Sequence, residues 1–229
     1  MFFDPRYLIF VGPFVIIALL AKLWVDSAFA RWSRHPASSR LSGAQVAQAV
    51  LAHAGVHDVR IEQSQGYLSD HYDPRERVLR LSPPVFQGAS VAASAIAAHE
   101  AGHAMQHSVA YAPLQLRSFY VPIAQFGSML FLPLFIAGLL LSIKPLALAG
   151  LVLFGAAVVF QLITLPVEFD ASRRAKRVLA DTGLITDAEE AAGVSSVLTA
   201  AAMTYVAATL QSIATLLYYL SVFNRSSRD

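Results

Sequence analysis

The stretch FYVPIAQFGSMLFLPLFIAGLLLSIKPLALAGLVLFGAAVVFQLITLP, residues 119–166, consists of two apolar runs separated by a single Lys-Pro pair. The runs extend from Phe119 to Ile143 and from Leu146 to Pro166, and each can form a helix that crosses about 30 Å of hydrocarbon. Because the turn between them is short, we expect an antiparallel hairpin that returns the chain to the membrane side it left. Glu168, which follows directly, is then expected on the side from which the hairpin started.

Two further apolar stretches extend from Tyr7 to Val25 and from Val197 to Phe223. The first is longer than the apolar core of a signal peptide, and no small-residue cleavage site follows it, so we expect a retained anchor. Of the 229 residues, 56% are hydrophobic and 14% are charged, which is too apolar for an ordinary soluble domain. The sequence therefore predicts a multi-pass membrane protein with four transmembrane helices.

The Lys and Arg residues divide unequally between the two membrane sides that four spans define. Basic residues near spans favour the cytoplasmic side, so the richer side is expected to be cytoplasmic and both chain ends to face outward. The richer side holds Arg31, Arg34, Arg40, Arg60, Arg75, Arg77, Arg80, Arg117, Arg173, Arg174, Lys176 and Arg177, and the poorer side holds Arg6, Lys144, Arg225 and Arg228.

Composition also excludes several classes of function. The chain has no cysteine, which rules out disulfide frameworks, iron–sulfur clusters and a thiol nucleophile. The net charge is only +2, and the basic residues form no stripe with interleaved aromatic residues. Nucleic acid is therefore not an expected partner.

The polar segment 26–117 has the pattern of a small α+β domain. Ser42 and Gln45 form a capping box that predicts a helix start. Residues 59–63 alternate as in a strand, and Val78 to Leu81 forms a second short strand after a turn. An alanine-rich helix is expected from about Ser90 to His107.

This alanine-rich helix carries His99-Glu100-Ala101-Gly102-His103, which fits the H-E-x-x-H pattern. Residues four apart lie on one face of a helix, so both imidazoles can reach a single metal ion, and Glu100 is placed to act as general base toward water. The neighbouring small residues leave room for another helix to approach. The alternative is a helix with two structural histidines and a surface glutamate.

A catalytic zinc usually has three protein ligands, so a third ligand is needed. The histidine-rich extended motif would require a histidine at position 109, where the sequence has Val109, and this leaves a carboxylate. Glu168 is the best candidate, because a glutamate at the edge of hydrocarbon is costly unless it is coordinated. The alternative is a carboxylate that simply favours a helix N-terminus.

Four other polar residues are candidates for supporting roles. Asp170 fits the helix N-terminus equally well, or can hydrogen-bond a metal-binding histidine. His107, one turn beyond His103, can be a ligand, a transition-state donor or the polar end of the helix. His71 and Tyr72 lie in the expected turn between the strands, where either can stabilise an oxyanion or serve ordinary turn structure.

The run from Tyr67 to His107, with Ser69-Asp70-His71-Tyr72-Asp73-Pro74, Leu79-Arg80-Leu81-Ser82 and Ala98-His99-Glu100-Ala101-Gly102-His103-Ala104, resembles the YugP-type neutral zinc metallopeptidases of bacterial membranes. The segment from Leu165 to Arg174 is similar to the second block of that family. The resemblance implies a zinc-dependent peptidase of the bacterial inner membrane with a glutamate as third ligand. It covers most of the chain.

A more distant likeness is to the HtpX and CAAX prenyl protease group, which pairs an H-E-x-x-H helix with a later Glu-x-x-x-Asp segment. Glu168 matches that glutamate, but Ser172 stands where the group has its aspartate, and Asp170 is the residue expected to substitute. In such proteases a strand before the zinc helix binds extended substrate. The likeness therefore makes Val78, Leu79, Arg80 and Leu81 the candidate edge strand for substrate.

The expected fold is mainly α, with about four transmembrane helices and a small gluzincin-like α+β zinc-peptidase domain next to the membrane. The expected function is endopeptidase cleavage of peptides or membrane proteins at the cytoplasmic membrane surface, with one zinc ion per chain held by His99, His103 and Glu168. The alternative is a zinc-binding membrane scaffold or chaperone-like protein without hydrolysis. The predicted segments are a membrane anchor (1–25), the metallopeptidase domain (26–117), a transmembrane hairpin (118–166), a third-ligand helix with linker (167–196), and a fourth span with tail (197–229).

Overall fold

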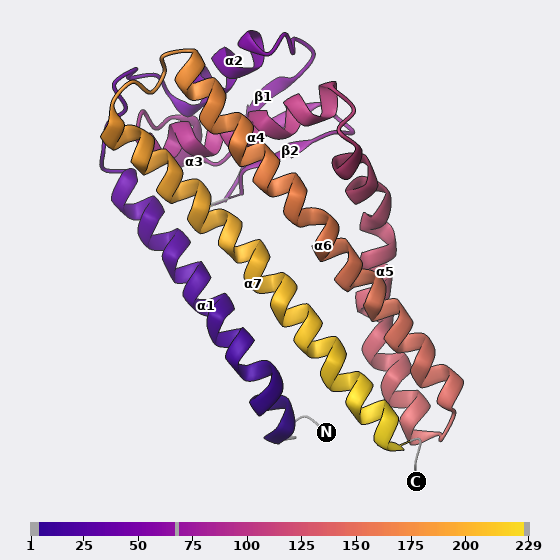
Figure 1. Cartoon of the computed structure of the whole chain (residues 1–229). Helices are drawn as coiled ribbons and strands as arrows, with labels where there is room; N and C mark the ends of the chain where they lie inside the picture. Colours follow the sequence, from indigo (N-terminus) through magenta and orange to yellow (C-terminus); the bar gives the residue numbers. More distant parts are fainter. Residues whose placement is uncertain (1–4, 67–68, 227–229) are drawn as a thin grey trace. The chain divides into compact units, whose positions relative to one another are not determined.

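The structure is a computed structural model that describes residues 5–66 and 69–226, so Tyr67, Leu68 and Arg228 lie outside the described residues. Four long helices and a small sheet with shorter helices make up the described chain (Figure 1). The helices are α1 (Pro5–Trp32), α2 (Gly43–His53), α3 (Pro83–Phe86), α4 (Val91–Ser108), α5 (Ala112–Leu140), α6 (Lys144–Asp181) and α7 (Ala188–Ser226), and the strands are β1 (Arg60–Gln63), β2 (His71–Asp73) and β3 (Val78–Leu81).

The chain forms two units, and each of the four long helices contributes to both. The first, called the helical unit below, comprises Met1–Ala21, Gln115–Pro166 and Thr204–Asp229. The second, called the polar unit, comprises Lys22–Leu114 and Val167–Met203. The boundary at Pro166 coincides with the expected end of the third span.

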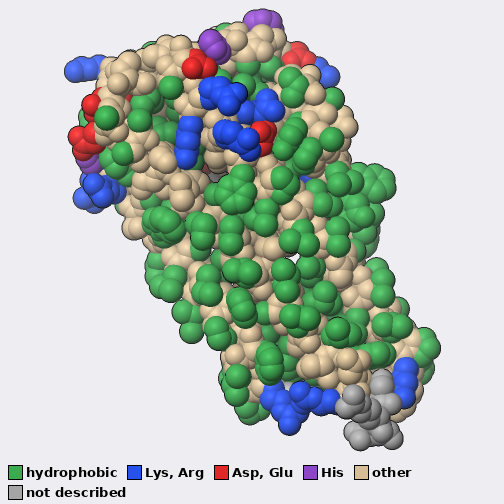
Figure 2. Space-filling view, viewed as in Figure 1, with side chains coloured by type: hydrophobic (Ala, Val, Ile, Leu, Met, Phe, Trp, Pro, Cys, Tyr) green, Lys and Arg blue, Asp and Glu red, His purple; other side chains and the backbone are tan. Residues whose placement is uncertain are grey.

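The helices α1, α5, α6 and α7 are long and apolar enough to cross a membrane, which confirms the four expected spans. Large hydrophobic side chains of the helical unit point outward, among them Leu8, Phe126 and Val152, each more than half exposed. Figure 2 shows such side chains covering the visible face of these helices. An outward apolar surface of this kind is stable in lipid and costly in water, as expected of a multi-pass membrane protein.

The expected hairpin is formed by α5 and α6, whose backbones approach closely. A Cβ added at Gly138 of α5 would lie 2.3 Å from the backbone nitrogen of Ala147 in α6, so glycine permits the contact. Phe131, Phe135 and Leu151 fill the space beside it with buried side chains. Close approach through small residues is the usual way in which helices pack where water provides no driving force between them.

The sheet of the polar unit has the order β1-β3-β2, with β1 parallel and β2 antiparallel to β3. The central strand is therefore Val78–Leu81, so its expected position at the sheet edge was wrong. Both sides of β3 are already paired, and three of its four side chains are buried against the core. The segment expected to be only a turn contains β2, which is one of the two edges.

The helix starts of the polar unit follow the predicted local signals. The Ser42–Gln45 capping box is formed in full at the start of α2, and Ser90 caps α4 by accepting a hydrogen bond from the backbone of Ala93. The third-ligand segment differs from the prediction of a separate helix, because α6 continues through Pro166 to Asp181. A proline inside a helix of this kind is tolerated where neighbouring groups satisfy the freed backbone.

Candidate metal centre

The histidines of the H-E-x-x-H motif project from one face of α4. The ring centroids of His99 and His103 are 4.9 Å apart, as the four-residue spacing requires. His103 is buried, whereas His99 and Glu100 are partly exposed. The pair can therefore reach a common ligand position from a rigid helix, with the general-base candidate at its exposed side.

Helix α6 reaches this face of α4 because Gly102 has no side chain. A Cβ added at Gly102 would lie 2.8 Å from the carbonyl oxygen of Ala171, too close for real contacts. The small residues of the motif thus allow the α4 and α6 backbones to touch. This contact places Glu168, one turn earlier on α6, beside the imidazoles.

Glu168 completes a three-residue cluster that can hold a metal ion. Its Oε2 lies 3.3 Å from His99 Nε2 and 3.6 Å from His103 Nε2, and the three candidate donor atoms lie within 4.8 Å of one another. A tetrahedral zinc with bonds of about 2.0–2.1 Å separates its donors by roughly 3.4 Å. The two distances to the carboxylate fit that spacing, and two nitrogens with one oxygen are donors that zinc accepts.

The charges within the cluster agree with a ligand role for Glu168. Burial raises the pKa of this carboxyl, but hydrogen bonds from His103 and His99 outweigh burial and hold the pKa well below its usual range. Burial lowers the pKa of His103, but the hydrogen bond and charge of Glu168 outweigh it and raise the pKa overall. The carboxylate is therefore anionic, as metal binding requires, and the imidazoles compensate its burial.

Each imidazole makes a hydrogen bond through Nδ1, the ring nitrogen that does not face Glu168. His99 Nδ1 lies 3.2 Å from the hydroxyl oxygen of Ser172, and His103 Nδ1 lies 3.0 Å from Oε1 of Gln106. With Nδ1–H donating in both cases, both Nε2 atoms face Glu168 and can exchange the hydrogen bond to the carboxylate for a bond to a metal. Ser172, which stands where the distant protease group has aspartate, thus contacts an imidazole directly, whereas Asp170 was expected to take that role.

Gln106 is a site residue that the sequence prediction missed. Its side chain is fully buried, and its amide nitrogen donates to the Val167 carbonyl at 2.8 Å and to Asp170 Oδ2 at 3.0 Å. Asp170 therefore supports His103 through Gln106 rather than by a direct hydrogen bond. The one signal in the sequence was the position of Gln106 three residues after His103, on the same helix face.

Asp170 is itself fixed on α6 by basic neighbours. Arg174 Nε donates to Asp170 Oδ2 at 2.6 Å, and the Arg174 guanidinium stacks over the Tyr111 ring at 5.6 Å. Burial raises the pKa of Asp170, but the hydrogen bonds from Arg174 and Gln106 lower it overall, so the group is charged. A continuous chain of hydrogen bonds thus runs from Arg174 to His103.

The structure brings Tyr72 and His107 together and separates them from His71. The Tyr72 hydroxyl and His107 Nδ1 share a hydrogen bond of 2.8 Å, which joins β2 to α4 one turn beyond His103. In the sheet, Tyr72 is paired with buried Leu79, whereas His71 is paired with Arg80 on the opposite face. His71 is exposed, hydrogen-bonds the Ser69 carbonyl at 2.9 Å and lies on the sheet face opposite to Tyr72.

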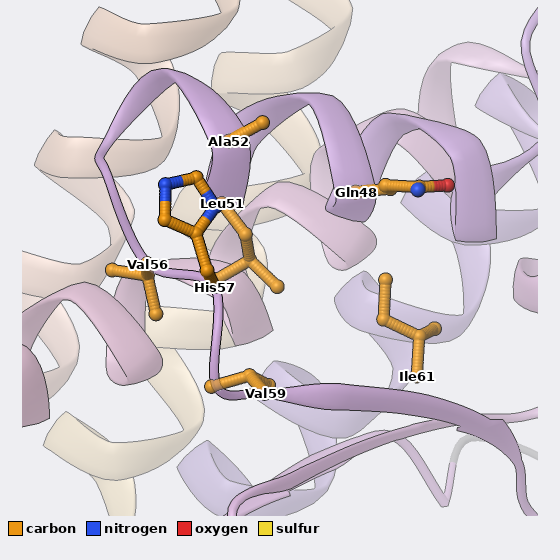
Figure 3. A pocket seen from close by; sticks show the side chains of 7 residues that line it. All are labelled: Gln48, Leu51, Ala52, Val56, His57, Val59 and Ile61. Carbon is orange, nitrogen blue, oxygen red and sulfur yellow. The ribbon is translucent and has the colours of Figure 1, made fainter.

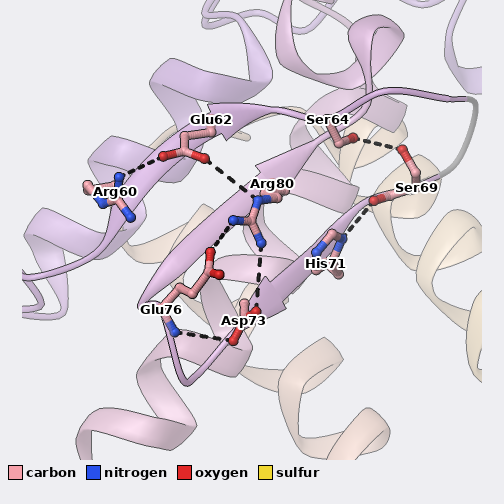
Figure 4. Close-up of polar contacts among 8 residues, drawn as sticks. All are labelled: Arg60, Glu62, Ser64, Ser69, His71, Asp73, Glu76 and Arg80. Carbon is pink, nitrogen blue, oxygen red and sulfur yellow. Dashed lines mark hydrogen bonds and ion pairs between the residues drawn. The ribbon is translucent and has the colours of Figure 1, made fainter.

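The outward face of the sheet is occupied by an ion-pair network (Figure 4). Arg80 of β3 lies 3.6 Å from Glu62 of β1 and 3.7 Å from Asp73 of β2, and it also pairs with Glu76. The side chain therefore ties the three strands together and is not free for substrate. Exposed pairs of this kind each contribute little, and a network contributes more than isolated pairs.

A separate groove of about 340 Å³ lies between α2 and β1 (Figure 3). Its lining contains one histidine, His57, and no carboxylate. It lacks the mixture of imidazole and carboxylate donors that a catalytic zinc requires. The lining residues are Gln48, Leu51, Ala52, Val56, His57, Val59 and Ile61.

Replacement of Gln106 with leucine should weaken metal binding without removing a ligand. The expected loss is roughly 10–100-fold in zinc affinity, because His103 loses the group that fixes its ring and Asp170 loses a donor. Competition with a zinc-binding dye measures this affinity. The exposed neighbour Ser108→Ala on the same helix is the control, and an unchanged affinity in Gln106→Leu would remove Gln106 from the site.

Comparison with known proteins is consistent with this geometry. Residues 7–224 match a family model described as "Putative neutral zinc metallopeptidase". A protein of Bacillus subtilis (strain 168) named "Putative membrane protease YugP" is 46% identical over 207 residues, which cover 90% of this chain and 92% of that protein. No solved structure matches the chain.

Proposed function

The chain belongs to the neutral zinc metallopeptidase family, and we propose that it is a membrane-bound endopeptidase that hydrolyses peptide bonds at the membrane surface. The observation that carries the proposal is the placement of Glu168 Oε2 at 3.3 and 3.6 Å from the two Nε2 atoms. A structural zinc site closes its fourth position with a further protein ligand, whereas a catalytic site leaves it open. Among the described residues, the candidate cluster contains three members.

The residues around the cluster supply the remaining parts of a hydrolytic site. A zinc ion bound there would polarise the substrate carbonyl and lower the pKa of water. Glu100, half-buried and close enough for its charge to act on His103, takes the proton of the attacking water and later delivers it to the leaving amine. Ser172 and Gln106 keep the two imidazoles oriented while this occurs.

Tyr72 is proposed as the donor that stabilises the developing oxyanion. With His107 Nδ1–H donating to the Tyr72 oxygen, the phenolic hydrogen stays available to the substrate. Burial raises the pKa of Tyr72, so the hydroxyl remains protonated at neutral pH. His107 is then a positioning residue for Tyr72, and His71 has no part in the reaction.

Substitution Tyr72→Phe tests this role. Loss of one oxyanion donor lowers kcat by about 100-fold or more, and it should leave KM and zinc content nearly unchanged. His71→Phe, the neighbouring change on the opposite face, is the control and should keep normal turnover. Equal kcat in Tyr72→Phe and the unmodified protein would remove the hydroxyl from the mechanism.

The substrate strand is reassigned from β3 to β2. Within the described sheet, β2 pairs with β3 along one edge, and its Tyr72 reaches the zinc helix. An extended peptide can add to the side of β2 that does not face β3. Backbone hydrogen bonds would hold the peptide there and bring its carbonyl groups past α4. This arrangement suits peptides and unfolded segments of membrane proteins.

The proposed side of the membrane is the cytoplasmic one, because the basic residues gather in the polar segments that flank the spans. The site would then act on substrates that reach the inner face of a bacterial membrane. A reporter fused to the C-terminus tests this topology, since the proposal places both chain ends outside the cytoplasm.

The competing function is a zinc-binding scaffold that does not hydrolyse peptides. Glu100 disfavours it, since a site that only binds metal has no need of a base beside its ligands. The experiment is peptide cleavage by the purified full chain before and after chelation, followed by zinc addition. Cleavage that is lost with the chelator and restored by zinc supports the peptidase, whereas stoichiometric zinc without any cleavage supports the scaffold.

A further inference from the structure

A cavity of about 180 Å³ lies between α6 and α7 within the polar unit. Its apolar wall is formed by Phe169, Leu198, Ala202 and Met203, and its polar wall by Ser172, Arg173, Lys176 and Thr199. None of the metal-ligand candidates lines it. The cavity is therefore distinct from the metal centre, although Ser172 borders both.

The polarity of the cavity changes along α6. On α6, Phe169 follows the last apolar residues of the third span, whereas Lys176 lies seven residues farther from it. On α7, Met203 directly precedes the residues of the helical unit, and Leu198 lies five residues earlier, so the α7 wall is apolar at both ends. On the α6 wall the apolar end is thus nearest the spanning segment and the basic end farthest from it, at about 1.5 Å per residue.

One cation at the polar end, Lys176, is poorly compensated by the protein. Lys176 donates to the neutral Ser195 hydroxyl at 2.9 Å, and no carboxylate of the described chain lies within ion-pair distance of its amine. Partial desolvation lowers the pKa of Lys176, which is otherwise exposed and open to a bound anion. Arg173 is two-thirds exposed and lies 3.9 Å from Asp170, so its guanidinium can also contact an incoming anion.

We propose that this cavity binds an anionic phospholipid, with the phosphate at Arg173 and Lys176 and the start of an acyl chain against Phe169 and Met203. The site matches the order of a phospholipid at the membrane surface, where the phosphate lies above the acyl chains. Neighbouring Arg177 extends the positive surface, and Figure 2 shows Lys and Arg side chains gathered on the polar unit. With Arg174, which pairs with Asp170, the stretch after the third span holds four basic residues, and clusters of this size favour anionic lipids.

This lipid site does not depend on the proposed peptidase activity, because its readout is lipid binding. The purified full chain in detergent is titrated with phosphatidylglycerol or phosphatidylcholine, and bound lipid is counted by native mass spectrometry. Phosphatidylglycerol is expected to bind more tightly. The double substitution Arg173→Gln/Lys176→Gln should weaken it by roughly 25-fold, since each cation contributes about a factor of five at an anionic lipid surface.

A matched double substitution, Arg34→Gln/Arg75→Gln, removes two exposed cations elsewhere in the polar unit and should leave the affinity unchanged. Thr199 is an exposed cavity residue, so Thr199→Glu should repel the phosphate, whereas Thr199→Gln, a side chain of similar size, should not. This pair remains informative if the double substitution at the cavity fails to fold.

Three results would overturn the lipid site. The first is equal binding of phosphatidylcholine and phosphatidylglycerol. The second is equal lipid binding by Thr199→Glu and Thr199→Gln. The third is displacement of the bound lipid by inorganic phosphate at comparable concentration, which would show a site for free phosphate rather than for a lipid.

Discussion

Replacement of Glu100 with glutamine is expected to lower peptide hydrolysis by orders of magnitude while zinc stays bound. The amide keeps the size of the side chain but cannot accept the proton of the attacking water. Loss of a positioned general base costs about 10²–10⁴-fold in turnover. Zinc affinity should stay within a few-fold of normal, because His99, His103 and Glu168 are untouched.

Two assays on one preparation measure this result: zinc by elemental analysis and kcat with a fluorogenic peptide. Glu76→Gln, on the outward face of the sheet, removes a carboxylate far from the proposed chemistry and serves as the control. If Glu100→Gln cleaved peptide at the normal rate, another residue would have to act as base.

The second large effect is expected for Glu168→Ala, which should release the metal. The substitution removes one of three donors, so zinc affinity should fall by more than the roughly 10–100-fold that follows loss of an outer hydrogen bond. Activity should disappear with the metal. Equilibrium dialysis against buffered zinc measures the change directly.

Glu190→Ala provides a matched control for the loss of a buried glutamate. Glu190 lies in the polar unit, is 8% exposed and accepts hydrogen bonds from the backbone and hydroxyl of Ser38. Its removal should lower thermal stability and leave zinc affinity intact. Equal zinc affinity in Glu168→Ala and Glu190→Ala would exclude Glu168 from the ligand set.

Much of the architecture follows from local signals in the sequence. Apolar length alone predicts the four long helices, and side-chain capping predicts the starts of α2 and α4. The hairpin argument also identified Glu168 as the carboxylate returning toward the histidines, because a short turn leaves few alternatives. These features depend on nearby residues or on simple chain geometry.

The order of the strands could not be predicted in the same way. Alternating residues show that Val78–Leu81 is a strand, but they do not say which strands pair with it. Its four-residue run is too short to distinguish a central strand from an edge, and the three-residue β2 was hidden in a segment rich in turn residues. Pairing is a long-range property set by packing against α4 and by the Arg80 network.

The hydrogen bonds that orient the ligands were also beyond local prediction. Gln106 and Ser172 become site residues only when α4 and α6 touch at Gly102 and Ala171. The small residues that permit this contact can be recognised in the sequence. The rotation of α6 about its own axis, which the contact fixes, cannot be. The same rotation explains why Asp170 meets Gln106 and not an imidazole.

The central claim is that one metal ion is shared by two residues of α4 and one of α6. An experimental structure of the zinc-loaded full chain, with an anomalous map at the zinc edge, tests it most directly. The account predicts a single strong peak bonded to His99 Nε2, His103 Nε2 and a carboxylate oxygen of Glu168. A peak bonded to the two histidines with Glu168 turned away, or a peak at any other residues, would contradict it.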